Sequence, residues 1–165
     1  DYGNYYAWGE TSPKTSYTED NCKTRRKSSG DIGGDSRYDA ATANWGSGWR
    51  LPTESEFDEL IDNCTWTWTK LNGVNGYEVK SKKNGNSIFL PAAGSYGGDT
   101  PHYQGSDGYY WSSLNSDNLN VYSLIFGRGL HSTHWGRSHY YGYSVRPVAE
   151  EQRMQLIYDG PSIEE

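Results

Sequence analysis

Residues 53–69 contain a change of period that constrains the fold more than any other part of the chain. The first half has the spacing i, i+3, i+4 and i+7 of one apolar helix face, formed by Phe57, Leu60, Ile61 and Cys64. Directly afterwards the period falls to two, because Trp66 and Trp68 alternate with threonines, as in a half-buried strand. The chain must therefore combine helix with sheet.

The start of this helix is marked by its own residues. Thr53 precedes Glu56 by three positions, which is the spacing of a capping box, and Pro52 stands just before it. We predict a helix over residues 53–64, with Cys64 as a small buried apolar residue on its inner face. A shorter helix is predicted over residues 38–44, ahead of a Gly-Ser-Gly turn.

Asn-Gly pairs divide the middle of the chain into short strands, because this dipeptide favours tight hairpin turns. Strands are predicted at residues 77–81, 87–90, 109–113, 121–126 and 143–148. Leu124 and Phe126 are expected to face the core, since they lie two residues apart. Residues 95–108 are predicted to be a long loop, and the segment between the last two strands has no clear period.

Composition sets further bounds on this chain of 165 residues, which suits one compact domain. Aromatic residues make up 15%, which excludes a disordered chain despite a mean hydropathy of −0.94. The net charge of −6 argues against a nucleic-acid partner, and no apolar run is long enough for direct membrane insertion. Cys22 and Cys64 leave one disulfide open as an alternative, and they do not have the spacing of a zinc site.

Residues 105–148 differ in composition from the rest of the chain. They contain no Lys, Glu, Gln or Met, whereas residues 1–104 contain fourteen of these. The segment is rich in Tyr, Ser, Gly, Asn, His and Arg, which give large contact area and adaptable hydrogen bonds at low entropic cost. We interpret it as a binding face held by the first hundred residues.

The predicted ligand-binding residues extend over about residues 96–144. They are Tyr103, Asn118, Asn120, Arg128, His131, Ser132, His134, Trp135, Arg137, His139, Tyr140 and Tyr141. For Trp135, packing against its own loop is an alternative of equal weight to ligand contact. Four neighbouring residues are assigned to the scaffold, with Arg146 in a partly buried ion pair: Tyr109, Tyr110, Trp111 and Arg146.

Several motifs resemble one known family. They are YYAWGE (5–10), the long run 38–68 with WGSGWRLPTESEFDELI, NGYEV (75–79), IFLPAAG (88–94), GYYWSS (108–113) and YSVRPV (143–148). Together they resemble the Fibrobacter succinogenes major paralogous domain, a module of surface proteins in gut Bacteroidetes. The resemblance covers residues 1–148 and implies an α+β, C-type lectin-like domain: two helices, small antiparallel sheets and a long irregular ligand-presenting region.

The same resemblance sets expectations for the two ends of the chain. Members of the family usually have another strand before the segment that starts here, and the first and last strands of the fold pair. An unpaired edge would result here. Residues 149–165 are a C-terminal extension. Its segment 153–160 is one candidate for the pairing strand, and the alternative is that the usual strand is missing from this sequence.

C-type lectin-like domains of this kind also resemble the variable proteins of diversity-generating retroelements. In those systems Asn codons of the form AAY become NNY, which never encodes Lys, Glu, Gln, Met or Trp. The composition of residues 105–148 fits that process, with Trp111 and Trp135 from unmutated codons. Ordinary drift in a Tyr- and Ser-rich family is the alternative.

Three classes of function follow. The first is a ligand-binding module, displayed outside a bacterial cell or on a phage particle, that binds a protein or glycan. The second is a static structural or adhesin module with the same fold. An enzyme of the formylglycine-generating type is disfavoured, because that activity uses cysteines in the C-terminal half and this chain has none after Cys64.

No cofactor or metal is expected. His131, His134 and His139 have the spacing i, i+3 and i+8 in a Gly- and Ser-rich stretch, without an acidic residue nearby in sequence. The EPN, QPD and WND triplets of calcium-dependent lectins are missing from the chain. The fold name alone does not establish sugar binding.

Overall fold

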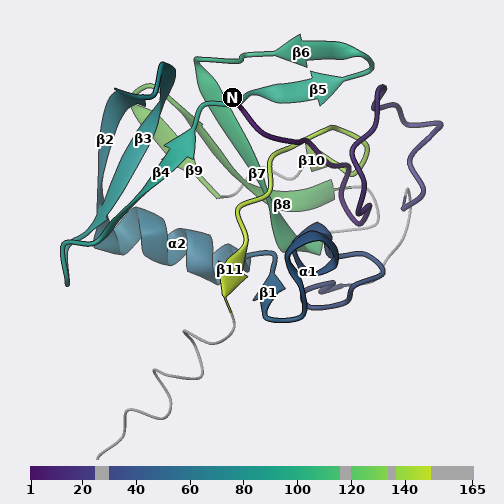
Figure 1. Ribbon diagram of the computed structural model, residues 1–165, viewed down its shortest axis with the longest axis horizontal. Coiled ribbons are helices and arrows are strands. Elements are labelled where there is room, and N and C mark those ends of the chain that lie inside the picture. The colour runs from purple at the N-terminus through teal and green to yellow at the C-terminus, as the bar shows by residue number, and fades with distance from the viewer. Residues whose placement is uncertain (25–29, 116–119, 134–136, 150–165) are drawn as a thin grey trace, which may run out of the picture.

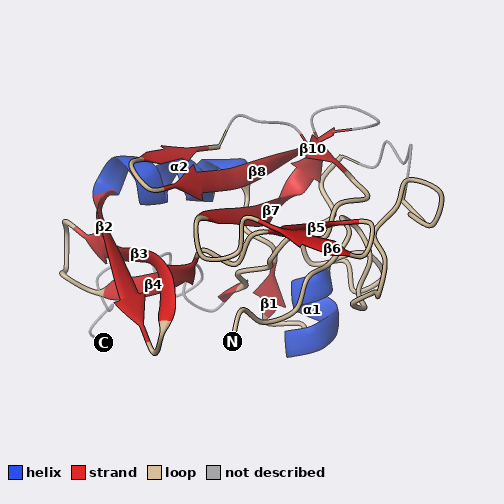
Figure 2. Ribbon diagram, turned by 90° about the horizontal axis from the view of Figure 1, so that it is seen from above, coloured by secondary structure: helices blue, strands red, loops and turns tan. Residues whose placement is uncertain are grey.

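The computed structural model describes residues 1–24, 30–115, 120–133 and 137–149. Within these residues the fold is α+β, with two helices and several small antiparallel sheets (Figure 1). The three-stranded sheet β2–β3–β4 lies at one end of the molecule and helix α1 toward the other (Figures 1 and 2).

The centre of the molecule is a sheet built on two long strands. Strand β7 (Asp107–Asn115) pairs with β8 (Asn120–Gly127), and its register shifts between Trp111 and Asn115. The short strands β9 (Leu130–Ser132) and β10 (Arg137–Ser138) both pair with β8, at its opposite ends. The strands predicted at 109–113 and 121–126 are therefore confirmed.

A second sheet contains β2 (Cys64–Leu71), β3 (Val74–Ser81) and β4 (Ser87–Pro91). Asn72 and Gly73 close the first hairpin with φ of 50° and 80°, the left-handed conformations that a two-residue type I′ turn needs. The Asn-Gly turn and the alternating strand after the helix are confirmed.

Both predicted helices are present. Helix α1 spans Ala40–Trp45 and helix α2 spans Glu54–Asn63. Thr53 and Glu56 form the reciprocal capping box. Burial by itself would raise the pKa of Glu56, but hydrogen bonds from Arg50 and Thr53 outweigh it and hold the pKa below its ordinary value.

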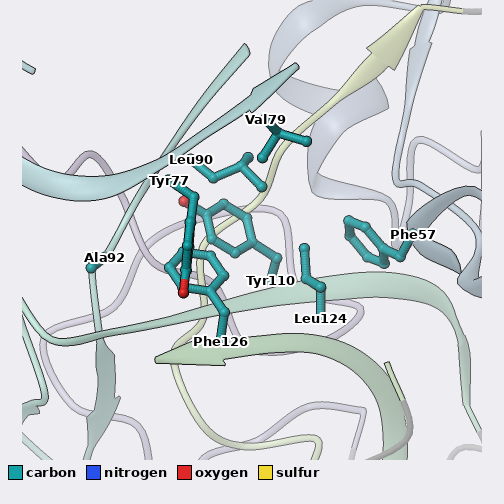
Figure 3. Packing of buried hydrophobic residues seen from close by; sticks show 8 residues of the cluster. All are labelled: Phe57, Tyr77, Val79, Leu90, Ala92, Tyr110, Leu124 and Phe126. Carbon is teal, nitrogen blue, oxygen red and sulfur yellow. The ribbon is translucent and has the colours of Figure 1, made fainter. Parts of the chain in front are cut away.

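Two apolar clusters cover the two faces of the central sheet. On one face, helix α2 and the sheet β2–β3–β4 enclose Phe57, Tyr77, Val79, Leu90, Ala92, Tyr110, Leu124 and Phe126 (Figure 3). On the other face lie Trp8, Ile32, Leu51, Tyr109, Trp111, Val121 and Tyr143. The predictions that Leu124 and Phe126 face the core, and that Tyr109, Tyr110 and Trp111 belong to the scaffold, are confirmed.

The predictions for two segments were wrong in part. Residues 95–108 were expected to be a loop but contain the hairpin β5 (Ser95–Gly97) and β6 (Thr100–His102). Residues 143–148 were expected to be a strand, but they form isolated bridges, such as Tyr6 with Tyr143, before the short strand β11 (Val148–Ala149). The partner of β11 is β1 (Trp49–Arg50). The candidate pairing strand 153–160 lies outside the described residues.

Three smaller expectations also have an outcome. Cys22 and Cys64 are both free thiols, so the disulfide alternative is wrong. Arg146 is half-buried, but no ion pair of it is found among the described residues. Among the described residues, no helix is long and apolar enough to span a membrane.

Candidate ligand-binding surface

The structure divides the predicted ligand-binding residues between separate places. Asn120 is the first residue of β8, and Arg137 pairs with the next residue, Val121. Arg128 follows Gly127, the last residue of the same strand. An extended strand rises about 3.3 Å per residue, so the two ends of β8 are about 23 Å apart. The predicted residues therefore do not form one continuous face.

A chain of aromatic rings connects three of the predicted residues. The ring centroids of Tyr103 and Tyr109 are 6.4 Å apart, and those of Tyr109 and Tyr143 are 5.0 Å apart. Tyr143 lies nearly parallel to Tyr141 at 6.2 Å, and Tyr141 contacts Tyr140 at 4.5 Å. Tyr109 and Tyr143 are buried, so they form the support beneath the outer rings.

His102 connects the two ends of this row of aromatic rings. A methyl group placed on Gly97 would lie 3.5 Å from the Tyr141 ring and 3.7 Å from His102 Nε2, so both rings lie over Gly97. The His102 ring is 6.1 Å from that of Tyr103. We call the patch formed by His102, Tyr103, Tyr140 and Tyr141 the tyrosine surface.

Tyr103 is exposed, with 61% of its surface in contact with solvent. Its φ of 59° lies in the left-handed region, which bulky residues rarely adopt. Its carbonyl oxygen accepts hydrogen bonds from the backbone N–H groups of Ser106, at 3.1 Å, and Asp107, at 3.0 Å. Gly94 packs against this loop so closely that an added methyl group would lie 2.1 Å from His102 O.

The residues that follow Tyr103 are fixed to the scaffold. Gln104 Nε2 donates to the Tyr5 hydroxyl at 3.0 Å, and Gly105 N donates to the carbonyl of Ala92 at 2.8 Å. The side chain of Asn75 donates to the carbonyl of Gly105 at 3.1 Å. Three hydrogen bonds thus hold the two residues that follow Tyr103, whereas the Tyr103 side chain is exposed.

Tyr140 and Tyr141 are also positioned by backbone contacts. Gly142 and Tyr96 exchange two backbone hydrogen bonds of 2.9 Å, which fix the chain directly after Tyr141. The Tyr140 hydroxyl donates to that of Tyr141 at 3.4 Å. This hydrogen bond and partial burial raise the pKa of Tyr140 to about 12, so Tyr140 is a neutral hydrogen-bonding group at physiological pH.

His131 lies at the other end of β8 and is partly covered by the second sheet. Its ring stacks on Trp66 at 4.7 Å with an angle of 2° between the planes, and it meets the edge of Tyr77 at 6.4 Å. The interaction joins residues far apart in the sequence. Arg128 is exposed in the turn between β8 and β9.

A groove of about 350 Å³ adjoins His131, between helix α2 and strand β9. We call it the His131 groove; its lining residues are Asp58, Ile61, Asp62, His131, Ser132 and Thr133. Thr133 is buried and donates its hydroxyl hydrogen to Asp58 Oδ1. The groove is acidic, but the described residues contain no group of three or more side chains that could hold a metal ion.

His139 lies inside the molecule, so its predicted place on the ligand-binding face was wrong. Only 3% of it is exposed, and its ring packs against Trp8 at 4.8 Å. Its Nδ1 lies 3.0 Å from the carbonyl oxygen of Thr24, and its own carbonyl accepts from Trp8 N. The N-terminal segment folds over residue 139, which sequence spacing does not reveal.

Some predicted residues lie outside what the structure describes. Asn118, His134 and Trp135 are among them, and for Arg137 the backbone alone is described, in strand β10. Their predicted contacts with a ligand remain predictions.

Sequence reasoning also missed features that the fold creates. His102 was not among the predicted ligand-binding residues, although it stands next to Tyr103 in the sequence. Nothing local indicated that Trp66 reaches His131. A further cavity of about 420 Å³ near the N-terminal segment is lined by residues that include Glu10, Lys14 and Lys23. Its charges are partly satisfied within the protein, because Lys14 Nζ lies 3.3 Å from Glu10 Oε2.

Comparison of the chain with protein-family models, with curated proteins and with solved structures finds no match. The chemistry of the tyrosine surface is therefore the main guide to function. It offers aromatic faces, hydroxyl groups and one imidazole.

Proposed function

We propose that this chain is a ligand-binding module whose tyrosine surface binds a protein or glycan. The observation that carries the proposal is Tyr103, an exposed aromatic side chain on a left-handed backbone that three separate contacts hold in place. Backbone strain of this kind costs about 1–3 kcal/mol and is concentrated at functional sites.

The physical advantage of this arrangement is preorganisation. A ligand that binds a rigid tyrosine loses little protein entropy, because the loop is already ordered and the side chain has only two rotatable torsions. Tyr140 and Tyr141 add two further rings and a pair of hydroxyl groups.

The family resemblance supports the same proposal. Two helices, small antiparallel sheets and irregular segments that present the tyrosine surface are compatible with a C-type lectin-like domain. A module of that family would be displayed on a bacterial surface or a phage particle. No cofactor takes part in the proposed binding.

Diversification by a retroelement remains part of the proposal for the surface segments alone. Strands β7 and β8 also lie within residues 105–148, and burial disfavours Lys, Glu and Gln in such strands without any special mutational process. The surface positions Tyr140 and Tyr141 are where diversification would alter a ligand contact. Deep sequencing of this gene in its source population would show variation concentrated there and absent from residues 38–94.

The direct test is a binding screen of the purified protein against an immobilised glycan panel and a displayed peptide library. For each ligand recovered, Tyr103→Ala should weaken binding by about 2 kcal/mol, roughly 30-fold, because a central tyrosine anchor is lost. Its free energy of unfolding should change by less than about 0.5 kcal/mol, since the ring lies in solvent.

Leu71→Ala is the matched control for this test. Leu71 is also a large exposed side chain, at 50%, but it lies at the tip of the β2–β3 hairpin. Its variant should bind normally. Equal affinities for wild type and Tyr103→Ala would exclude the tyrosine surface, and failure to recover any ligand would favour a static structural module.

A further inference from the structure

Strand β2 is an outer strand of the sheet β2–β3–β4. In the part of the chain that the structure describes, its only strand partner is β3. The type I′ turn makes Leu71 and Val74 a doubly hydrogen-bonded pair, and such pairs then recur at every second residue. The backbone groups that point away from β3, toward the outer edge, are therefore those of Cys64, Trp66, Trp68 and Lys70.

The same alternation is confirmed on the far side of β3. Ala92 N donates to Asn75 O at 2.8 Å, as expected if the odd-numbered residues of β3 bond toward β4. Lys82 N likewise donates to Asn63 O at 3.1 Å, which continues the β2–β3 pattern beyond the strand. The direction of the free groups on β2 thus follows from the printed register.

This edge has little protection against pairing with another strand. Natural edges carry prolines, bulges or several charges, whereas the eight residues of β2 contain no proline, and Lys70 is their single charged residue. The register between β2 and β3 is continuous from Cys64 to Leu71, without a bulge. An eight-residue edge of this kind is a template for strand addition.

The sequence of the edge indicates which strand fits. Residues 65–69 have the sequence Thr-Trp-Thr-Trp-Thr, which is the same in both directions. We propose that two copies of this chain pair antiparallel through β2, with the two-fold axis at Thr67. Trp66 of each copy then lies opposite Trp68 of the other, and Cys64 lies opposite Lys70.

This register matches the free backbone groups. All four residues with outward N–H and C=O groups meet one another as doubly hydrogen-bonded pairs, and the two Thr67 residues form the central non-bonded pair, with Cα atoms about 4.5 Å apart. Thr65, Thr67 and Thr69 are exposed, so their side chains can pair across the interface. The indoles continue the apolar layer on the opposite face.

A dimer of this kind would leave both tyrosine surfaces free. Strand β2 lies at one end of the molecule, and the β5–β6 hairpin that carries His102 lies away from it (Figures 1 and 2). Two surfaces on one particle increase the avidity for a repetitive ligand without any new contact. The pairing itself does not depend on the proposed ligand.

Sedimentation equilibrium of the full chain tests the proposal. Wild type should approach twice the monomer mass of 18.6 kDa as its concentration rises. Thr67→Glu and Thr67→Lys each place two like charges at the two-fold axis, so each should raise the dissociation constant by up to about fivefold. Mixing the two variants should restore a dimer, because opposite charges then face each other.

Ser87→Glu and Ser87→Lys are the matched controls, since Ser87 is exposed on β4, two strands from the proposed interface. Both should dimerise like wild type, and thermal unfolding should show all four variants folded. A monomer at every concentration would overturn the proposal. A dimer that the Thr67 variants leave unchanged would also overturn it, because it would form through another surface.

Discussion

The tyrosine surface and the His131 groove each include residues from the stretch of unusual composition, 105–148, yet the fold uses their aromatic residues differently. Around Tyr103 the scaffold holds the backbone and leaves the ring in solvent. At His131 the ring itself is packed, because Trp66 stacks on it at 4.7 Å. The first arrangement leaves a side chain exposed to solvent, and the second joins two sheets.

This difference shows that composition alone does not define a binding face. A segment rich in Tyr, His and Ser supplies rigid side chains, but the fold decides which of them remain available. His139 is the clearest case, since it belongs to the same segment and is buried against Trp8. Backbone anchoring with an exposed ring is the more specific structural sign.

The largest effect is expected at the support of the tyrosine surface. Gly94→Ala should lower the free energy of unfolding by about 3 kcal/mol or more, because φ is 66° and the new methyl group would lie 2.1 Å from His102 O. Gly98→Ala is the control, since φ is 60° there but no atom lies within 4 Å. Gly98→Ala should lower the free energy of unfolding by only about 1 kcal/mol. Similar urea midpoints for the two variants would mean that the loop is not held as described.

Trp66→Ala sharpens the comparison from the other side. It removes the stack on His131 and the hydrogen bond from Nε1 to Leu60 O. The free energy of unfolding measured by urea titration should therefore fall by about 2–3 kcal/mol. Binding of any ligand recovered by the tyrosine surface should stay within twofold of wild type. A large loss of binding in this folded variant would show that the two regions act together.

The smallest effect concerns alkaline stability. The pKa of Tyr140 is about 12 in the folded protein, whereas an unfolded tyrosine has a pKa of about 10. The contribution of Tyr140 to the free energy of unfolding is therefore complete below pH 10 and is lost as the pH rises toward 12. Burial also raises the pKa of Tyr110 in the same direction. Tyr140→Phe should therefore lose stability less steeply than wild type between pH 9 and pH 11. An identical slope would argue against the hydrogen bond to Tyr141.

Local patterns were sufficient to predict most elements of the fold. The capping box, the apolar stripe of the helix and the Trp-Thr alternation each involve neighbours in sequence, and the structure contains all three. The β5–β6 hairpin was missed because residues 95–102 have no alternating apolar pattern. The hairpin is instead fixed by its surroundings, such as the bonds between Tyr96 and Gly142.

The candidate site was predictable only in part, for a physical reason. Residue types suited to binding are visible in the sequence, and Tyr103, Tyr140 and Tyr141 were selected on that basis. Their grouping depends on contacts between distant segments, such as the placement of His102 and Tyr141 over Gly97. Such contacts leave no periodic signal along the chain.

The most direct test of the central claim is hydrogen–deuterium exchange with a ligand recovered in the binding screen. The tyrosine surface predicts slower exchange in residues 96–107 and 138–143 on binding, with residues 127–133 unchanged. Protection confined to residues 127–133 and to helix α2 would place the ligand in the His131 groove and contradict the account.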